Sequence, residues 1–387
     1  MKDFLSERAK QLQQGSIRAF FDKAKGYKNV INMGIGEPDA DTPEPIIEAA
    51  YRAMLEGKTH YSANAGDIEV REQVAAYAAK YGAVADPVSE IILTMGGMGA
   101  LAMSLLCTVE PGDEVLVQDP QWLNYLSQIR FAGGTPVAVP VSEGNRFSIA
   151  APDIEAKITK RTKVLMLNSP NNPTGAVLSQ KELEDIAHVA QKHNLLVISD
   201  EVYCEMLYDG LTHHSIASIP GMKERTVVIN SCSKSFAMTG WRIGFAAGPK
   251  EIVKKMTVLQ ENLVACAPLP AQFAAKYAME TMCEVEAMRG AYTKRRDMMV
   301  DGLNAIDGVK CLRPSGAFYV FPNIMALGKT SQELAGKLLE QAQVVTIPGS
   351  AFGDHGEGYL RIAYANSEAN ILEGIRRIKA CLSGMRG

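Results

Sequence analysis

The sequence predicts an α/β protein with two parts: a large domain built on a doubly wound, mostly parallel sheet of seven strands, and a smaller α+β domain. The prediction rests on seven short apolar segments, at residues 91–95, 114–118, 135–139, 163–167, 195–199, 226–230 and 243–248. Most of them are unbroken hydrophobic runs, which are typical of strands buried on both faces. Amphipathic segments such as residues 179–194 lie between them, and this alternation favours parallel strands.

The pattern changes after Gly248. Residues 250–306 are expected to be helical with an interruption at Pro268 and Pro270, because proline ends or kinks a helix. Residues 317–365 return to short strands and one helix. A second domain is therefore expected after the seventh strand.

The domain boundaries follow from these patterns. We expect a large domain at residues 46–290, and a small domain formed by residues 1–45 together with residues 291–387. Residues 1–45 contain no strand–helix unit of their own, so they are expected to pack on the C-terminal part. A chain of 387 residues fits two domains at roughly 100–200 residues each.

The composition, with 47% apolar and 21% charged residues, is that of an ordinary globular protein. The formal charge of −3, from 40 Lys and Arg against 43 Asp and Glu, gives no indication of a nucleic-acid partner. Seven cysteines without a C-x-x-C pair, and six histidines without a metal-binding spacing, predict a reduced, cytoplasmic chain with no metal site. Residues 1–10 lack the apolar core of a signal peptide, and we expect no membrane span, which needs about 20 apolar residues.

A lysine follows the sixth apolar segment. Lys234 closes the run Ser231-Cys232-Ser233-Lys234, and ligands of open α/β sheets bind at the carboxyl ends of the strands. Partial desolvation there would lower the pKa of Lys234 and free its amine to form an imine with an aldehyde. Ser231, Ser233 and Arg242 could bind a phosphate beside it. For an isolated lysine, a surface position that caps a loop is the more common alternative.

Two further segments end in polar residues. Asp200 follows residues 195–199, where a buried carboxylate needs a cationic partner such as a protonated pyridine nitrogen. Tyr203 could then hydrogen-bond a phenolic oxygen, whereas a helix N-cap is the alternative role for Asp200. Asn172 lies in a Pro- and Gly-rich turn after residues 163–167 and could donate a hydrogen bond, with a plain turn as the alternative.

Glycines surround Met98 after the first segment, at Gly96, Gly97 and Gly99. They would let backbone N–H groups approach an anion at the start of a helix. The G-x-G-x-x-G pattern of a dinucleotide loop is completed neither here nor at the Gly-Ile-Gly run that starts at Gly34. A nicotinamide oxidoreductase is therefore disfavoured.

Trp122 and Arg361 complete the set of candidates. Trp122 follows the second segment and could stack on a planar ring, although core packing explains it equally well. Arg361 lies in a strand-like run and could clamp a carboxylate, or it could be an exposed, ion-paired arginine. An imine-forming lysine, a phosphate site, a pyridine partner, a stacking ring and a carboxylate clamp together indicate pyridoxal 5′-phosphate as the cofactor.

The sequence resembles the class I aminotransferases, which are pyridoxal-phosphate enzymes of fold type I, and in particular their bacterial aspartate/aromatic branch. The resemblance extends from residue 36 to residue 365. It is carried by the motif SxSKxFxMTGWRxG at residues 231–244 and by NNPTG at residues 171–175. It implies an aminotransferase that moves an amino group between an L-amino acid and a 2-oxo acid by a ping-pong mechanism.

The resemblance also implies roles for the residues around the cofactor ring. Lys234 would form the internal aldimine and move the proton between the substrate and the cofactor. Asp200 would pair with the ring nitrogen, with some support from Tyr125, and Trp122 would stack on the ring. Tyr203 would contact the phenolic oxygen together with Asn172.

Further residues are implied for the phosphate and the substrate. The phosphate would be surrounded by Gly97, Met98, Ser231, Ser233 and Arg242. Tyr61 would reach the phosphate in the neighbouring subunit, which implies a homodimer with shared active sites. The substrate α-carboxylate would be bound by Arg361, Asn172 and the backbone of Gly36.

Two departures from the family pattern bear on specificity. Some relatives that accept acidic substrates have a lysine where this chain has Met98, and small hydroxyl residues where it has Gly15 and Ile17. An apolar wall disfavours a dicarboxylate unless Arg18 or another cation takes part. The same scaffold also supports a β-lyase, a racemase or an aminocyclopropane-carboxylate synthase, and these alternatives stay open at this point.

Overall fold

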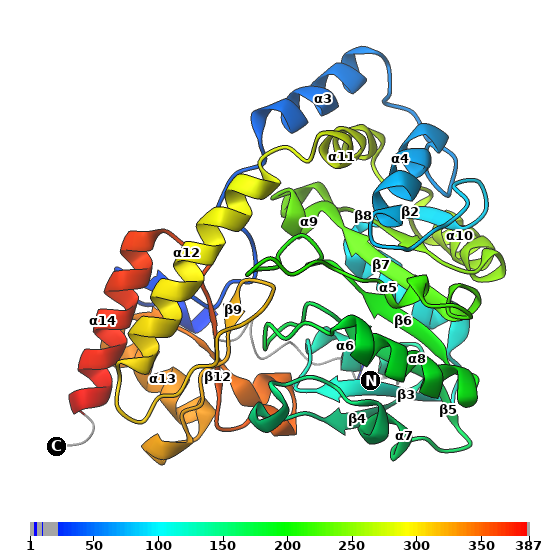
Figure 1. Ribbon diagram of the computed structural model, residues 1–387. Coiled ribbons are helices and arrows are strands. Elements are labelled where there is room, and N and C mark those ends of the chain that lie inside the picture. The colour runs from blue at the N-terminus through cyan, green and yellow to red at the C-terminus, as the bar shows by residue number, and fades with distance from the viewer. Residues whose placement is uncertain (1–3, 6–9, 11–21, 385–387) are drawn as a thin grey trace.

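A seven-stranded sheet forms the centre of the protein in the computed structural model, which describes residues 4–5, 10 and 22–384 (Figure 1). Its spatial order is β2-β8-β7-β6-β5-β3-β4. The strands are β2 (Ile91–Met95), β3 (Glu114–Asp119), β4 (Thr135–Pro140), β5 (Thr162–Asn168), β6 (Leu196–Asp200), β7 (Thr226–Ser231) and β8 (Ile243–Ala247). All seven predicted strands are confirmed, and their ends differ from the prediction by one residue at most.

The sheet is mostly parallel, as predicted. β4, β3, β5, β6 and β7 are parallel to one another, whereas β8 is antiparallel to both β7 and β2. The reversal of β8 follows from its short connection to β7, which contains only α9 (Cys232–Ser235) and one 3₁₀ turn. A parallel crossover needs a dozen or more residues and usually a full helix.

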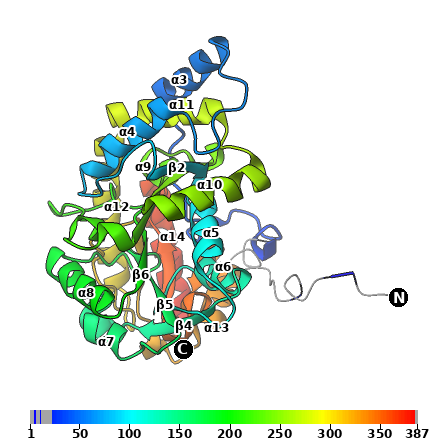
Figure 2. The same cartoon turned by 90° about the vertical axis from the view of Figure 1, so that its right-hand side faces the viewer.

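Helices cover both faces of the sheet (Figure 2). One face, with Val164 and Ile198, packs against α5 (Gly96–Thr108), α6 (Asn124–Phe131) and α10 (Lys250–Val264). The other face packs against α4 (Ile68–Ala79), α7 (Ala151–Glu155), α8 (Gln180–Lys192) and α11 (Leu269–Thr281). Neighbouring residues of one strand therefore face different apolar layers, which explains why the strands read as unbroken hydrophobic runs.

The helical region after the sheet differs from the prediction at Pro270 and at residues 282–284, where a second break separates α11 from α12 (Val285–Asn304). The interruption lies at residues 265–268, between α10 and α11, as expected for Pro268. The prediction for Pro270 is wrong, because this residue lies in the first turn of α11. A proline is tolerated there because the first backbone N–H groups of a helix have no partner within the helix.

The C-terminal part contains a second, smaller sheet beside three helices. Its strands β9 (Tyr319–Val320), β12 (Leu360–Ala363) and β11 (Ile347–Pro348) are antiparallel, and β10 (Val344–Val345) pairs in parallel with β1 (Ile31–Asn32). The helices are α12 (Val285–Asn304), α13 (Ser331–Ala342) and α14 (Glu368–Gly384), while α3 (Glu44–Leu55) packs on α11. Ile31 and Met33 lie in the apolar core of this C-terminal part.

Two features are absent from the residues that the structure describes. None of their helices combines the length and the hydrophobicity needed to cross a membrane. They also contain no group of three or more histidine, cysteine or acidic side chains arranged to hold a metal ion.

Candidate active site

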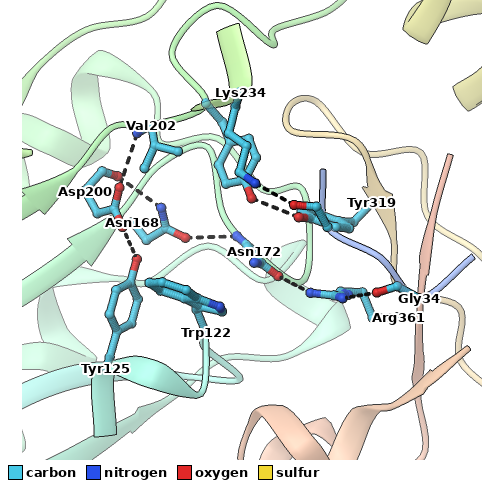
Figure 3. A pocket seen from close by; sticks show the side chains of 12 residues that line it. Gly34, Trp122, Tyr125, Asn168, Asn172, Asp200, Val202, Lys234, Tyr319 and Arg361 are labelled. Atoms are coloured by element: carbon cyan, nitrogen blue, oxygen red, sulfur yellow. Dashed lines mark hydrogen bonds between the residues drawn. The ribbon is translucent and has the colours of Figure 1, made fainter. Parts of the chain in front are cut away.

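A cavity of about 210 Å³ lies where the carboxyl ends of β3, β5, β6 and β7 meet the C-terminal part (Figure 3). Its lining residues come from chain segments that are far apart in the sequence. They are Gly34, Gly36, Trp122, Tyr125, Asn168, Asn172, Asp200, Val202, Tyr203, Lys234, Tyr319 and Arg361. The carboxyl ends of parallel strands are the usual place for a ligand in such a sheet.

Asp200, the last residue of β6, is buried beneath this cavity with 4% of its surface exposed. Its carboxylate accepts hydrogen bonds from the Tyr125 hydroxyl at 2.6 Å and from the Val202 backbone N–H at 3.2 Å. Desolvation raises the pKa of Asp200 to about 6, and these two hydrogen bonds oppose that rise. The carboxylate is therefore largely ionised at neutral pH and is suited to a cationic partner.

Lys234 points into the cavity from α9, directly after β7, and its Nζ donates to the backbone oxygen of Gly36 at 2.5 Å. Desolvation lowers the pKa of Lys234 to about 8. The charge of Glu37 opposes this effect, and those of Arg361 and Arg242 add to it. Far more of this amine than of an ordinary lysine is therefore neutral, and thus nucleophilic, near neutral pH.

Arg361 reaches the cavity from β12 and is 3% exposed. Its Nη1 donates to Oδ1 of Asn172 at 3.1 Å, and its Nη2 donates to the backbone oxygen of Gly34 at 2.6 Å. The buried Nε of Arg361 has no hydrogen-bond partner among the described residues. A buried guanidinium that retains an unused donor is well suited to an anionic ligand.

The aromatic residues line the remaining walls. Trp122 lies edge-to-face with Tyr125, with ring centroids 5.3 Å apart, and leaves its indole face toward the cavity (Figure 3). The hydroxyl of Tyr203 lies 2.9 Å from that of Tyr319. Burial raises the pKa of Tyr203 well above its ordinary value, so this hydroxyl stays protonated and can donate.

The residues expected around a phosphate come together beside Lys234, although they do not line the cavity itself. Gly96 has φ +69°, and a Cβ built on it would lie 2.6 Å from Nη2 of Arg242. A Cβ on Gly97 would lie 3.5 Å from Cβ of Ser231. At Gly96 a side chain would therefore crowd Arg242, whereas Gly97 is in ordinary contact with Ser231, and the glycines leave the backbone N–H groups of this helix start uncovered.

The other predicted phosphate residues occupy the neighbouring turns. Met98 lies in the first turn of α5 and is 36% exposed. Ser233 is buried in α9, where its backbone N–H donates to the Ser231 hydroxyl at 3.0 Å. Arg242 donates from Nη1 to the backbone oxygen of Thr239 at 2.8 Å.

Tyr61 is the one predicted site residue that the chain does not bring to this region. Its side chain is 87% exposed, in the loop between α3 and α4. Gly15, Ile17 and Arg18, which were expected to form the specificity wall, lie outside the described residues.

Sequence reasoning assigned no role to Asn168 or Tyr319, which both line the cavity. Asn168 ends β5, donates to the Asp200 backbone oxygen at 3.0 Å, and accepts from the Asn172 N–H at 2.9 Å. The sequence feature that could have identified Asn168 is its position at the end of a buried strand, which is equivalent to the position of Asp200. Tyr319 lies in a two-residue strand, which is too short for a periodic pattern to reveal.

Comparison with known proteins decides the family. The family model described as aminotransferase class I and II matches residues 28–378. The chain belongs to this family. It is 43% identical over 382 residues both to aromatic-amino-acid aminotransferase 2 of Thermococcus litoralis and to an aspartate aminotransferase of Pyrococcus abyssi, with 98% of each chain covered. An aspartate aminotransferase structure from Thermus thermophilus with maleate has a TM-score of 0.93 at 38% identity, and covers 98% of this chain and 100% of that one.

This class I and II aminotransferase has the fold of the type I pyridoxal-phosphate enzymes. It uses pyridoxal 5′-phosphate to exchange an amino group between an amino acid and a 2-oxo acid. The names of its relatives favour this activity over a β-lyase, a racemase or an aminocyclopropane-carboxylate synthase.

The cavity of this aminotransferase fits that cofactor. Asp200 is a buried acid whose charge a protonated ring nitrogen would compensate, and Lys234 is a lysine of lowered pKa within the same cavity. The glycine-rich start of α5 beside Arg242 has the chemistry and the lack of side chains that a phosphate requires. The unpartnered Nε of Arg361 remains for the substrate.

The lowered pKa of Lys234 predicts how fast the apoenzyme takes up its cofactor as the pH changes. Only the neutral amine attacks the aldehyde, so the rate of covalent incorporation should rise with pH through a midpoint near 8. Stopped-flow absorbance from pH 6 to 10 would measure this midpoint, and N-α-acetyl-lysine with the same aldehyde is the control. Glu37→Gln should move the midpoint to lower pH, because the carboxylate of Glu37 raises the pKa of Lys234. A midpoint equal to that of the free lysine would contradict the prediction.

Proposed function

We propose that Lys234 carries out the proton transfers of this transamination and holds the cofactor covalently between turnovers. The observation that carries the proposal is the convergence of three groups on one cavity: the Lys234 amine, the Asp200 carboxylate and the Arg361 guanidinium. An amine of lowered pKa, a buried acid and a carboxylate-binding cation are the three functions that the reaction requires.

When bound, pyridoxal phosphate withdraws electrons from the α-carbon of the amino acid and so weakens its C–H bond. Asp200 supports this withdrawal because its buried carboxylate keeps the ring nitrogen protonated. Tyr125 and the Val202 N–H hold that carboxylate in place. Trp122 would cover one face of the ring, and Tyr203 and Asn172 would donate hydrogen bonds to the phenolic oxygen.

The substrate is oriented by its carboxylate. Arg361 binds it through the guanidinium edge that includes the unpartnered Nε, while Asn172 and the backbone of Gly36 flank it. This orientation presents the α-hydrogen to Nζ of Lys234. The neutral amine accepts the proton from the α-carbon of the substrate. It would then donate this proton to the cofactor carbon that is bonded to the substrate nitrogen, so that it acts first as base and then as acid. The same residues serve the second half-reaction in reverse, which gives ping-pong kinetics.

The phosphate is held by Gly97, Met98, Ser231, Ser233 and Arg242. Support comes from the close packing of Gly96 on Arg242 and of Gly97 on Ser231. Helix N–H groups, hydroxyls and a guanidinium are the usual donors to a phosphate. Fixing the phosphate keeps the ring in register with Lys234 and Asp200 throughout the reaction.

Replacing Lys234 tests the central assignment. Lys234→Ala should lower kcat by about 10⁴-fold, because general acid–base catalysis alone contributes about 10²–10⁴-fold. It should also abolish borohydride-fixed labelling of the peptide that contains residue 234. Lys163→Ala is the control, since Lys163 is a half-exposed lysine that pairs with Asp113 at 2.8 Å. Wild-type turnover by Lys234→Ala, or label on another lysine, would refute the assignment.

We also propose that the enzyme prefers amino acids with aromatic or other apolar side chains over dicarboxylic ones. Among the described residues that line the cavity, Lys234 and Arg361 are the cations, and both already have a role. Met98 at the start of α5 adds no charge. As far as the described residues go, a second substrate carboxylate would therefore be desolvated without a cation to pair with.

A substrate panel tests this preference. We expect kcat/KM for phenylalanine to exceed that for aspartate by about tenfold or more, with 2-oxoglutarate and pyruvate compared as acceptors. Met98→Lys should raise the aspartate value without a matching rise for phenylalanine. Met325→Lys, which adds the same charge at an exposed position outside the cavity, is the control. A wild-type preference for aspartate would overturn the proposal.

The active unit is proposed to be a homodimer in which Tyr61 reaches the phosphate of the partner. Tyr61 is exposed and lies outside its own cavity, so in this chain alone it has no site to serve. Exposed apolar side chains also gather in α3, with Tyr51 and Leu55, and at the end of α10, with Leu263 and Val264. Groups of exposed large apolar side chains are typical of an interaction surface.

Hybrid dimers test the shared site. Tyr61→Ala and Lys234→Ala should each be poorly active at a cofactor concentration that just saturates the wild type. Their random mixture should recover about one quarter of wild-type activity, because half of the dimers carry one site free of both substitutions. The inactive control is a mixture of Lys234→Ala chains with chains that carry both Tyr61→Phe and Lys234→Ala. Light scattering gives the mass, and a mixture that merely averages its parents would exclude site sharing.

Two broader proposals complete this picture. Residues 46–290 form the large domain, and residues 1–45 with 291–387 form the small one; the pairing of β1 with β10 and the burial of Met33 in the C-terminal core support this division. The protein acts in the cytoplasm, which is supported by the free state of all seven cysteines.

A further inference from the structure

We propose that Tyr319 is a positioning residue for transamination: its hydroxyl directs that of Tyr203 toward the phenolic oxygen of the cofactor, and its ring fixes Arg361 for the substrate carboxylate. The inference rests on the roles proposed above for Tyr203 and Arg361. It adds a physical link between the substrate-binding arginine and the cofactor-binding tyrosine, which come from different parts of the fold.

The first half of this link is the packing of Arg361 on Tyr319. The guanidinium carbon lies 4.6 Å from the centroid of the Tyr319 ring. Tyr319 is 1% exposed and pairs in β9 with Ala363 of β12, the strand that carries Arg361. The ring and the cation are therefore held by the same small sheet. A desolvated cation gains more from an aromatic face than an exposed one.

The second half is the hydrogen bond between the two phenols. The oxygens of Tyr203 and Tyr319 are 2.9 Å apart, and their rings meet edge-to-face with centroids 5.9 Å apart. Gly36 closes the other side, since a Cβ built on it would lie 2.5 Å from the Tyr319 oxygen. The hydroxyl of Tyr319 is thus confined between Gly36 and Tyr203.

The direction of that hydrogen bond follows from proton counting. Each phenol carries one proton. If Tyr203 donates to the cofactor oxygen, its own oxygen must accept from Tyr319, and no other acceptor for Tyr319 exists among the hydrogen bonds of the described residues. A donor that itself accepts a hydrogen bond is polarised and donates more strongly. Tyr319 therefore strengthens the contact that stabilises the deprotonated phenolic oxygen.

A pH titration of the holoenzyme's visible absorption tests the hydroxyl. Tyr319→Phe should raise the titration midpoint by about half a pH unit, because weaker donation from Tyr203 favours the protonated chromophore. Tyr203→Phe should raise it further. The double variant should match Tyr203→Phe alone, because Tyr319 acts through Tyr203. Tyr364→Phe is the matched control: it removes another buried hydroxyl of the same core, which bonds the Ala317 oxygen at 3.1 Å, and should leave the midpoint unchanged.

Steady-state kinetics test the ring. Tyr319→Phe keeps the aromatic face and should leave KM for the amino acid within about twofold, whereas Tyr319→Leu should raise KM about tenfold or more. Thermal melting verifies that each variant is folded. The inference would be overturned, and the role of Tyr203 left intact, by either of two results. One is an unshifted midpoint in Tyr319→Phe; the other is that Tyr319→Phe shifts the midpoint as much in the Tyr203→Phe variant as in the wild type. An unshifted midpoint in Tyr203→Phe would instead overturn the proposed role of Tyr203, and the inference with it.

Discussion

The burial of one carboxylate at the centre of the sheet constrains most of this active site. Asp200 ends β6, which lies between β5 and β7, so its surroundings are supplied by the neighbouring strand ends. Desolvation works against its charge, and the Tyr125 hydroxyl, the Val202 backbone N–H and the charge of Lys234 oppose that cost. A cationic ring nitrogen completes the balance. The same fold that makes the acid costly therefore makes the cofactor an integral part of a stable site.

Because the strands are parallel, a few residues are enough to form the centre of the active site. Three adjacent strand ends deliver Asn168, Asp200 and Lys234 to one edge, each in a different chemical role. Asn168 joins two of these groups, because it binds the Asp200 backbone and the Asn172 N–H at once. Burial lowers the pKa of the lysine and raises that of the acid, which brings both nearer to neutral pH. One desolvated edge thus tunes two groups of opposite charge.

Much of the fold could be predicted from the sequence because buried parallel strands are apolar without interruption. All seven strands were located, and with them the strand ends that carry Lys234 and Asp200. A local sequence pattern does not show which distant residues contact each other. The packing of Tyr319 on Arg361 is an example, because it joins two short strands of the small sheet. Pro270 shows a related failure, since a proline in a helix start and one in a helix break look alike until the boundary is known. The glycine cluster around Met98 indicated an anion site, and family resemblance assigned Gly97 and Met98 to the phosphate, whereas the role of Tyr61 rests on the resemblance alone.

The bond between Arg361 and the backbone oxygen of Gly34 spans almost the whole chain, and β1 pairs with β10 close by. No contiguous fragment shorter than residues 34–361 contains both ends of this contact. During synthesis the substrate-binding half of the cavity can assemble only after β12 has left the ribosome, when nearly all of the polypeptide is available. A chain therefore acquires a working site only when both its translation and its folding are complete.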